Sequence, residues 1–402
     1  MKPLQVTRAG RTGLWTLRFV VTLIAGQFVW PGTGIRAQAA QGGIGVEQAT
    51  RLIALAQPRL RDASGWAADI LWAIRFSGQP VNAENVCAVI AVVDQETNFK
   101  INPHVQGMSR RALSALEDRL AASDIKSLAL RGILALDPSI RVRLTERLRT
   151  ATTERDLDLA YRRLVEDILQ IETIIRLDSE YGLGAAEFLE AQNEVKTIGS
   201  MQVSVAAALD FERRFLGRAL YFEDIYRVRD DLYTRRGGLL NGTRLLLGYR
   251  SGYTRKVHRF ADYNAGRYAS RNAAFQWALS RIGGKELSLD GDLLIYRDRK
   301  PSSTRSATER ALLKIAQAHD LRLISHDIRR DLLREKEFGF TDTATFKAVS
   351  ALYRSLFGRP APFARLPEIK LESVKIDRQL TTAWFARRVD GRYKACMNRL
   401  AG

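Results

Sequence analysis

The stretch AVIAVVDQETNF, Ala88–Phe99, determines the expected fold because an apolar run ends there in polar and acidic residues. The eight residues 86–93 are all apolar, and the acids Asp94 and Glu96 follow them. A helix that is apolar on every side is buried rather than lying at a surface. The sequence therefore predicts a buried helix over residues 83–97 that ends beside the carboxyl group of Glu96.

The surroundings expected for Glu96 suit proton transfer. Val89 and Val93 precede it by seven and three residues, so they share its face of the helix and border the carboxyl group with hydrocarbon. Desolvation and the helix C-terminus both disfavour a negative charge, and both raise the expected pKa of Glu96. A carboxyl group of this kind can act as a general acid. The plainer interpretation of Glu96 is a carboxylate at the edge of the core that pairs with an arginine. Asp94 points to another face of the helix and is expected to be a surface acid or an ion-pair partner rather than a catalytic residue.

Helical periodicity dominates the rest of the chain, so the expected class is mainly α. A turn and a short strand are expected in SLDGDLLIYRD, residues 288–298, and extended chain over residues 358–376. The expected helices cover residues 46–61, 64–76, 83–97, 109–122, 155–176, 202–217, 222–234, 253–263, 268–282, 305–319, 321–336, 343–357 and 379–398.

The first 39 residues have the pattern of a secretory signal peptide. A basic segment without acids precedes the twelve-residue apolar run FVVTLIAGQFVW, and Ala37 and Ala39 then form a small-x-small cleavage site. Twelve apolar residues are few for a membrane span. We therefore expect cleavage near Ala39 and export to the periplasm or cell envelope; the alternatives are an uncleaved anchor or a short core helix.

The net charge of the chain indicates which class of partner it could bind. The formal net charge is +19, and +14 remains without residues 1–39. Such a balance favours an acidic partner, and for an exported protein an anionic cell-envelope surface is expected rather than nucleic acid. A solvated basic surface without a partner is the alternative.

The chain has two cysteines. Cys87 and Cys396 could form one disulfide in an oxidising compartment, or Cys87 could be a buried apolar residue and Cys396 a lone thiol.

A second motif, TIGSMQVSVAAA, residues 197–208, has the residue types of a ligand-contacting loop. Gly199 allows the backbone to approach a ligand closely, and Met201 offers an adaptable apolar surface. Gln202 supplies both a hydrogen-bond donor and an acceptor. Met201 as a plain core residue is the alternative.

A third motif, FADYNAGRY, residues 260–268, is expected to end a helix at a corner. Gly266 is the expected stop, and the corner would carry Tyr263 and Asn264. A tyrosine there can present its hydroxyl group to a cleft. The alternative is that Tyr263 is a core residue.

These three motifs, in this order, resemble the soluble lytic transglycosylases of the lysozyme-like superfamily. QETNF is similar to their Glu-Ser-x-Phe segment, GSMQ to Gly-Leu-Met-Gln and DYNAG to Tyr-Asn-Ala-Gly. The resemblance covers roughly residues 80–285. It implies a lysozyme-like helical fold with Glu96 as the single catalytic acid and then base. It further implies a substrate-binding set of Thr97, Gly199, Ser200, Met201, Gln202, Tyr263 and Asn264, with Met201 and Gln202 lining sugar subsites, Tyr263 bonding near Glu96 and Asn264 shaping the corner.

The chain departs from the family pattern at two residues and in two spacings, of which the smaller is Pro103, two positions later after Phe99 than the family pattern has it. Thr97 stands for the usual Ser, and Ser200 for the usual Leu. Between Glu96 and Gly199 the family has a short connection, and we interpret residues 104–195 as a helical insertion beside the cleft. The expected domains are a signal peptide (1–39), a catalytic domain with this insertion (40–289) and a C-terminal helical extension (290–402).

The expected function is cleavage of the β-1,4 bond between N-acetylmuramic acid and N-acetylglucosamine in peptidoglycan glycan strands. The resemblance implies that Glu96 protonates the glycosidic oxygen and then takes the proton of the muramyl C6 hydroxyl, which leaves 1,6-anhydro ends. Hydrolase mechanisms instead need a paired carboxylate. No cofactor is expected, and the four histidines show no metal-ligand spacing. A lysozyme-type hydrolase and a non-catalytic cell-wall-binding or scaffold protein are the alternatives.

Overall fold

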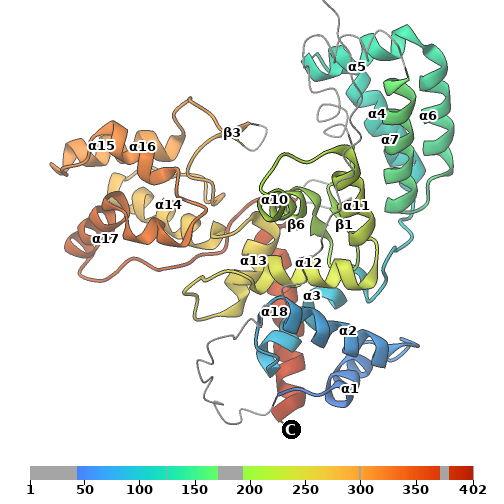
Figure 1. Cartoon of the computed structure of the whole chain (residues 1–402). Coiled ribbons are helices and arrows are strands. Elements are labelled where there is room, and N and C mark those ends of the chain that lie inside the picture. Colours follow the sequence, from blue (N-terminus) through green and yellow to red (C-terminus); the bar gives the residue numbers. More distant parts are fainter. Residues whose placement is uncertain (1–42, 124, 171–192, 298–299, 372–379, 402) are drawn as a thin grey trace, which may run out of the picture. The chain divides into compact units, whose positions relative to one another are not determined.

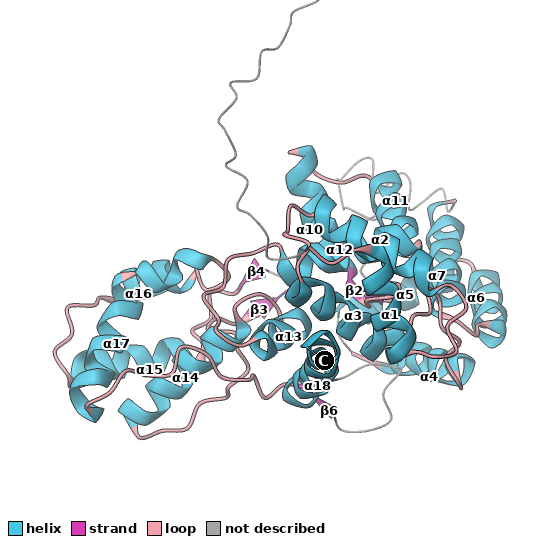
Figure 2. Ribbon diagram, turned by 90° about the horizontal axis from the view of Figure 1, so that it is seen from below, coloured by secondary structure: helices cyan, strands magenta, loops and turns pink. Residues whose placement is uncertain are grey.

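The computed structural model describes residues 43–123, 125–170, 193–297, 300–371 and 380–401 (Figure 1). The predicted signal peptide lies outside the described residues, as does the segment 171–192 of the predicted insertion. The described chain is mainly helical, as the sequence predicts, and its strands are short (Figure 2). In this part of the chain no helix has the length and apolar character needed to cross a membrane.

Within the described residues, three antiparallel pairs of short strands, β1–β2, β3–β4 and β5–β6, interrupt the succession of helices. The strands are β1 (Thr197–Ile198), β2 (Val203–Ser204), β3 (Tyr296–Arg297), β4 (Lys300–Pro301), β5 (Lys370–Leu371) and β6 (Leu380–Thr381). The helices are α1 (Val46–Ala56), α2 (Ala63–Phe76), α3 (Ala83–Thr97), α4 (Met108–Ala121), α5 (Ile125–Leu136), α6 (Pro138–Thr150), α7 (Glu154–Leu169), α10 (Val205–Leu216), α11 (Phe222–Leu232), α12 (Arg235–Leu247), α13 (Lys256–Ala265), α14 (Ala269–Gly283), α15 (Ala307–Ala318), α16 (Ser325–Leu332), the 3-10 helix η1 (Phe338–Asp342), α17 (Ala344–Phe357) and α18 (Thr382–Ala401).

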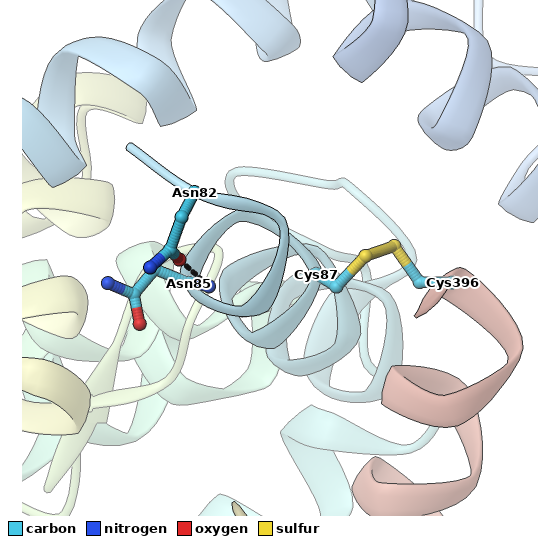
Figure 3. Close-up of a disulfide and its surroundings, with 4 residues drawn as sticks. All are labelled: Asn82, Asn85, Cys87 and Cys396. Atoms are coloured by element: carbon cyan, nitrogen blue, oxygen red, sulfur yellow. Dashed lines mark hydrogen bonds between the residues drawn. A yellow bond between two sulfur atoms is a disulfide. The ribbon is translucent and has the colours of Figure 1, made fainter. Parts of the chain in front are cut away.

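Helix α3 is buried along most of its length, and its predicted bounds are confirmed. The Asn82 side chain caps it by accepting a hydrogen bond from the backbone N–H of Asn85 at 2.9 Å (Figure 3). Every residue from 85 to 94 is buried, and α1, α2, α12 and α18 contact the helix. It ends at Asn98, whose backbone is left-handed with φ 50°. The apolar run therefore forms the centre of the first hydrophobic core.

Helix α18 returns from the C-terminal end of the chain to pack against α3 and α13 (Figure 1). A disulfide joins Cys87 of α3 to Cys396 of α18 across 309 positions of sequence (Figure 3). Arg392 Nε also donates to Asp94 Oδ2 at 2.9 Å, which confirms Asp94 as an ion-pair partner. Of the two alternatives for the cysteines, the structure contains the disulfide.

Helices α4 to α7 lie within the predicted insertion and pack on one another. Their buried leucines belong to the same core as α3. Helix α7 is joined to α11 by a buried ionic cluster, in which Asp158 Oδ1 accepts from Arg229 Nε at 2.7 Å and Asp158 Oδ2 lies 2.8 Å from Arg162 Nη2. The insertion is thus fastened to the rest of the chain by buried charges as well as by apolar contacts.

A second hydrophobic core lies among α14, α15, α16, η1 and α17. It contains Phe275, Leu312 and Phe340, and the buried guanidinium of Arg271 donates to backbone carbonyls, including that of Glu337 at 2.8 Å. The two cores do not coincide with the predicted division at residue 290. Helix α14 precedes that division yet belongs to the second core, whereas α18 follows it and belongs to the first.

Candidate functional site

The end of α3 is hydrogen-bonded to the loop that carries the second motif. Thr97, on the last turn, is buried, and its hydroxyl donates to the carbonyl oxygen of Ser200 at 2.9 Å. Glu96, its neighbour, is half-buried. The next two residues, Asn98 and Phe99, both have left-handed backbones, so the chain turns sharply after the helix. Two motifs separated by about a hundred residues therefore meet at Thr97.

The second motif forms the tight turn between β1 and β2, whereas the sequence predicts that a helix begins at Gln202. The N–H of Gln202 donates to the Gly199 carbonyl at 2.9 Å, and α10 begins only at Val205. Gly199 has φ +80°, and a Cβ there would lie 2.2 Å from the carbonyl oxygen of Leu232. Glycine is required at this position by the neighbouring backbone as well as by the turn.

The third motif reaches the same turn through Tyr263. This residue is buried at the end of α13, and its hydroxyl donates to the carbonyl oxygen of Met201 at 2.8 Å. Burial, and after it the negative charge of Glu96, raises the pKa of Tyr263 well above its ordinary value. Glu96 and the Tyr263 hydroxyl are therefore electrostatic neighbours. The structure brings the acid, the turn and the tyrosine into one cluster.

The side chains of Ser200 and Met201 are fully buried, which differs from the predicted substrate-lining role of the Met201 side chain. Met201 packs against Gly242 of α12, where a Cβ would lie 2.3 Å from the methionine sulfur. A side chain without exposed surface does not line a subsite in this conformation. Both residues instead contribute their carbonyl oxygens, which hold Thr97 and Tyr263.

Gln202 is half-buried, and its amide is held from two sides. Its Oε1 accepts from the Thr197 hydroxyl at 2.9 Å, and its Nε2 donates to Glu154 Oε2 at 3.0 Å. Glu154 is a buried residue at the start of α7, and its carbonyl accepts from the Tyr233 hydroxyl at 3.1 Å. The predicted insertion thus reaches the turn directly, through a carboxylate that the sequence analysis did not single out.

Asn264 is exposed, and its side chain joins α13 to α18. Its Oδ1 accepts a hydrogen bond from the Thr382 hydroxyl at 2.9 Å. Gly266 then ends α13 with φ +103°, as predicted. The end of α13 is thus hydrogen-bonded to α18, which belongs to the C-terminal extension (290–402) that the sequence predicts as a separate part of the chain.

Asp262 is the main organiser of this corner and is a second residue that sequence reasoning missed. It is buried, and its carboxylate accepts from the hydroxyls of Tyr249 and Tyr253 and from the backbone N–H groups of Tyr268 and Ser270, at 2.7–3.0 Å. Burial raises its pKa, and these hydrogen bonds oppose the change. The sequence did contain a signal for Asp262: it is an acid flanked by apolar and aromatic residues at a helix end, and a buried acid needs several hydrogen-bond donors.

The cluster can support proton transfer by one carboxyl group. Because the Tyr263 hydroxyl donates to Met201, its oxygen keeps lone pairs that can accept a hydrogen bond from a protonated neighbour. Asp94, Glu154 and Asp262 are hydrogen-bonded to neighbouring side chains or backbone: Asp94 to Gln57 and Arg392, Glu154 to Gln202, and Asp262 to its four donors. Glu96 is the candidate for acid–base chemistry here because it lies beside the turn where the three motifs meet and its charge acts on the Tyr263 hydroxyl.

Comparison with known proteins places the chain beside uncharacterised relatives. A family model described as "Protein of unknown function (DUF1615)" matches residues 59–399. The chain is 36% identical over 338 residues to the "Uncharacterized protein YaiW" of Escherichia coli (strain K12), an alignment that covers 84% of this chain and 86% of that protein. No solved structure matches the chain.

Proposed function

The chain belongs to the DUF1615 family, whose function is unknown, and from the cluster around Glu96 we propose that it is a peptidoglycan lytic transglycosylase with a lysozyme-like fold. The observation that carries the proposal is the meeting of three motifs at one turn, through Thr97 to Ser200, Tyr263 to Met201 and the electrostatic contact of Glu96 with Tyr263. The motifs are similar to those of that enzyme family in residue type and in order.

In the proposed reaction Glu96 acts first as an acid and then as a base. Its proton passes to the oxygen of the MurNAc–GlcNAc β-1,4 bond, and the GlcNAc side leaves with a free hydroxyl. The resulting carboxylate takes the proton of the muramyl C6 hydroxyl, whose oxygen bonds to C1 and closes the 1,6-anhydro ring. The proton returns to Glu96, so the reaction is balanced without water and without a second carboxylate.

The remaining residues are assigned by their exposure. Gln202 and Asn264 have side-chain surface and are proposed to contact the sugars. Thr97, Gly199, Ser200 and Met201 are proposed to shape the turn from beneath, and the oxygen of Tyr263 is proposed to orient the Glu96 proton. No cofactor or metal enters this scheme.

The proposed setting is the periplasm or cell envelope, reached with the signal peptide of residues 1–39. The proposed partners are peptidoglycan glycan strands and an anionic envelope surface, to which a mature charge of +14 is complementary. The proposal predicts that the exported protein begins close to residue 40.

The first testable prediction concerns Glu96→Gln, which keeps the size of the side chain but removes the transferable proton. Incubated with isolated peptidoglycan, the parent chain should release muropeptides with anhydro ends, one water lighter than hydrolysis products by mass spectrometry. The variant should lose at least a hundredfold in release, the lower range for general acid catalysis, while still binding peptidoglycan. Glu286→Gln, which alters an exposed glutamate elsewhere, should leave release unchanged.

The other outcomes of this assay identify the alternatives. Reducing ends in place of anhydro ends would assign a lysozyme-type hydrolase. Binding by the parent chain without any release would assign a non-catalytic wall-binding protein. Equal release by the parent and Glu96→Gln would remove Glu96 from its proposed role.

A further inference from the structure

One side of α2 carries a line of aromatic rings around an acid. Trp66, Asp69, Trp72 and Phe76 follow one another at intervals of three or four residues, so they lie along one side of the helix. Asp69 is buried between the aromatic side chains on this side of the helix. A buried carboxylate requires strong donors, and two arginines from another helix supply them.

These arginines, Arg235 and Arg236, stand at the first turn of α12. Asp69 Oδ2 lies 2.5 Å from Arg235 Nε, and Oδ1 lies 2.8 Å from Arg236 Nε. The guanidinium carbon of Arg235 lies 5.3 Å from the centre of the Trp66 ring, and that of Arg236 lies 5.3 Å from the Trp72 ring. We call this set the α2 ladder: Trp66, Asp69, Trp72, Phe76, Arg235 and Arg236.

One end of the α2 ladder touches the segment that contains the proposed catalytic acid. The Trp66 ring meets the Phe99 ring edge-on, with centroids 5.3 Å apart, and Phe99 is three residues beyond Glu96. From Trp66 to Phe76 the helix rises by about 15 Å. Trp66, Asp69 and Phe99 are all buried, so this contact fixes the inner end of the ladder beside the Glu96 segment within the core, and only the far end of the ladder can meet a ligand.

The far end of the α2 ladder is open to solvent. Trp72 and Phe76 are stacked, with ring centroids 5.2 Å apart and planes 18° from parallel. Phe76 is 63% exposed, and the side chain of Arg236 is 66% exposed. A single exposed apolar side chain is common, but a stacked pair beside a fixed guanidinium is an ordered surface with both apolar and donor groups.

This combination suits a sugar chain. A pyranose ring offers a face of C–H groups that packs on an aromatic ring, and its hydroxyl and acetamido oxygens accept hydrogen bonds from a guanidinium. We propose that the open end of the α2 ladder, formed by Trp72, Phe76 and Arg236, binds aminosugar rings of a glycan strand beyond those that react at Glu96. The proposal rests on the proposed function: if Glu96 acts on a glycan strand, the open end of α2, a helix that packs against the helix carrying Glu96, can hold a further part of the same strand.

The test uses the full chain carrying Glu96→Gln, so that the probe is not consumed, and chitohexaose, the β-1,4 hexamer of N-acetylglucosamine. Isothermal titration should give a dissociation constant that rises about two- to tenfold when Phe76→Ala is added, the range for loss of one aromatic contact. Phe76 is exposed, so the variant should keep the circular dichroism and melting temperature of its parent. Phe76→Tyr keeps the ring and should restore the affinity.

Phe215→Ala is the matched control, because Phe215 is 76% exposed on α10, outside the α2 ladder. It should leave the dissociation constant unchanged. An unchanged constant for Phe76→Ala, or no binding of the hexamer by the parent, would overturn the proposal. So would a Phe76→Ala variant that dissociates a dimer of the chain without altering sugar affinity.

The proposed function is tested separately by release from peptidoglycan. Anhydro products with an unaffected Phe76→Ala titration would retain the enzyme and reject the ladder. Hexamer binding that depends on Phe76, without any release by the wild-type chain, would retain the ladder as a sugar-binding surface and reject the enzyme.

Discussion

Buried carboxylates in this chain are stabilised in two different ways. Asp158 has no exposed surface and lies between the guanidinium groups of Arg162 and Arg229. Glu335 is equally buried, but its donors are the hydroxyl of Tyr296 and the backbone N–H of Leu293, which are neutral. Burial raises the pKa of Glu335 to about 7, because neutral donors offset only part of the desolvation of its charge.

This pKa predicts how stability depends on pH. The ordinary pKa of a glutamate is 4.5, so between pH 4.5 and about 7 the folded chain keeps the Glu335 proton while the unfolded chain loses it. The free energy of unfolding should therefore fall as pH rises through this window, by about 3 kcal/mol from this group, and level off above it. Glutamine stays neutral, so Glu335→Gln should abolish this contribution. The free energy of unfolding of the variant, relative to that of the parent, should therefore rise with pH across this window.

Urea unfolding at pH 5 and pH 8 measures the effect. Glu337→Gln changes an exposed neighbour and is the control, with the same dependence on pH as the parent. If the parent and Glu335→Gln lose stability equally between the two pH values, Glu335 does not carry the proton assigned to it.

At the site itself, single-residue reasoning predicted positions better than it predicted side-chain roles. Glu96 and Tyr263 were selected from local patterns and Thr97 from the family resemblance, and the structure brings the three together. The buried state of Met201 depends on helix α12, and the hydrogen bond that Gln202 donates to Glu154 depends on helix α7, and both helices are remote in sequence. A local pattern has no information about which remote element will cover a residue.

Among the secondary-structure elements, α12 shows why propensity alone failed. The segment RRGGLLNGTRLLL contains three glycines, each of which disfavours a helix interior, so the sequence does not predict a helix there. In the structure a Cβ on Gly237 would meet the Asp231 carbonyl oxygen at 2.1 Å, and Gly242 faces Met201. The missing side chains allow close packing, and that tertiary gain outweighs the local cost.

The pairing of α3 with α18 leads to a prediction about the disulfide. A bridge between Cys87 and Cys396 restricts an unfolded chain over 309 positions, so its loss should lower the free energy of unfolding by about 2–4 kcal/mol. Denaturant unfolding of the parent with and without a thiol reductant measures this. The Cys87→Ala/Cys396→Ala variant should match the reduced parent and should not respond to reductant. A parent that is insensitive to reductant would contradict the assignment.

The division of the chain into two hydrophobic cores differs from the division along the sequence at residue 290. The predicted extension, residues 290–402, contributes α15, α16 and α17 to the second core, but its last helix completes the first. Phe385 and Val389 of α18 are buried there, and each contributes about 1.5–3 kcal/mol on burial. Together with the disulfide, these contributions approach the whole net stability of a typical protein.

A chain that ends at residue 379 should therefore fail to fold cooperatively around α3. The truncation leaves the second core complete but exposes the surfaces of α3 and α13 that α18 covers. Thermal unfolding followed by circular dichroism should show loss of the main transition, and a separate peptide of residues 380–402 should restore it. A truncated chain with the melting temperature of the parent would favour the independent catalytic domain that the sequence predicts.

The sequence by itself determined the class of the fold, the bounds of α3, the glycine stop of α13 and the motifs that meet around Glu96. These features depend on periodicity and backbone conformation within a few residues, which local sequence encodes. Only the tertiary structure decided that α18 closes the first core, that α12 is a helix, that Met201 is buried and that α7 supports Gln202. Each of these depends on burial against a remote segment, and the free energy of that burial is a property of the folded pair rather than of either sequence alone.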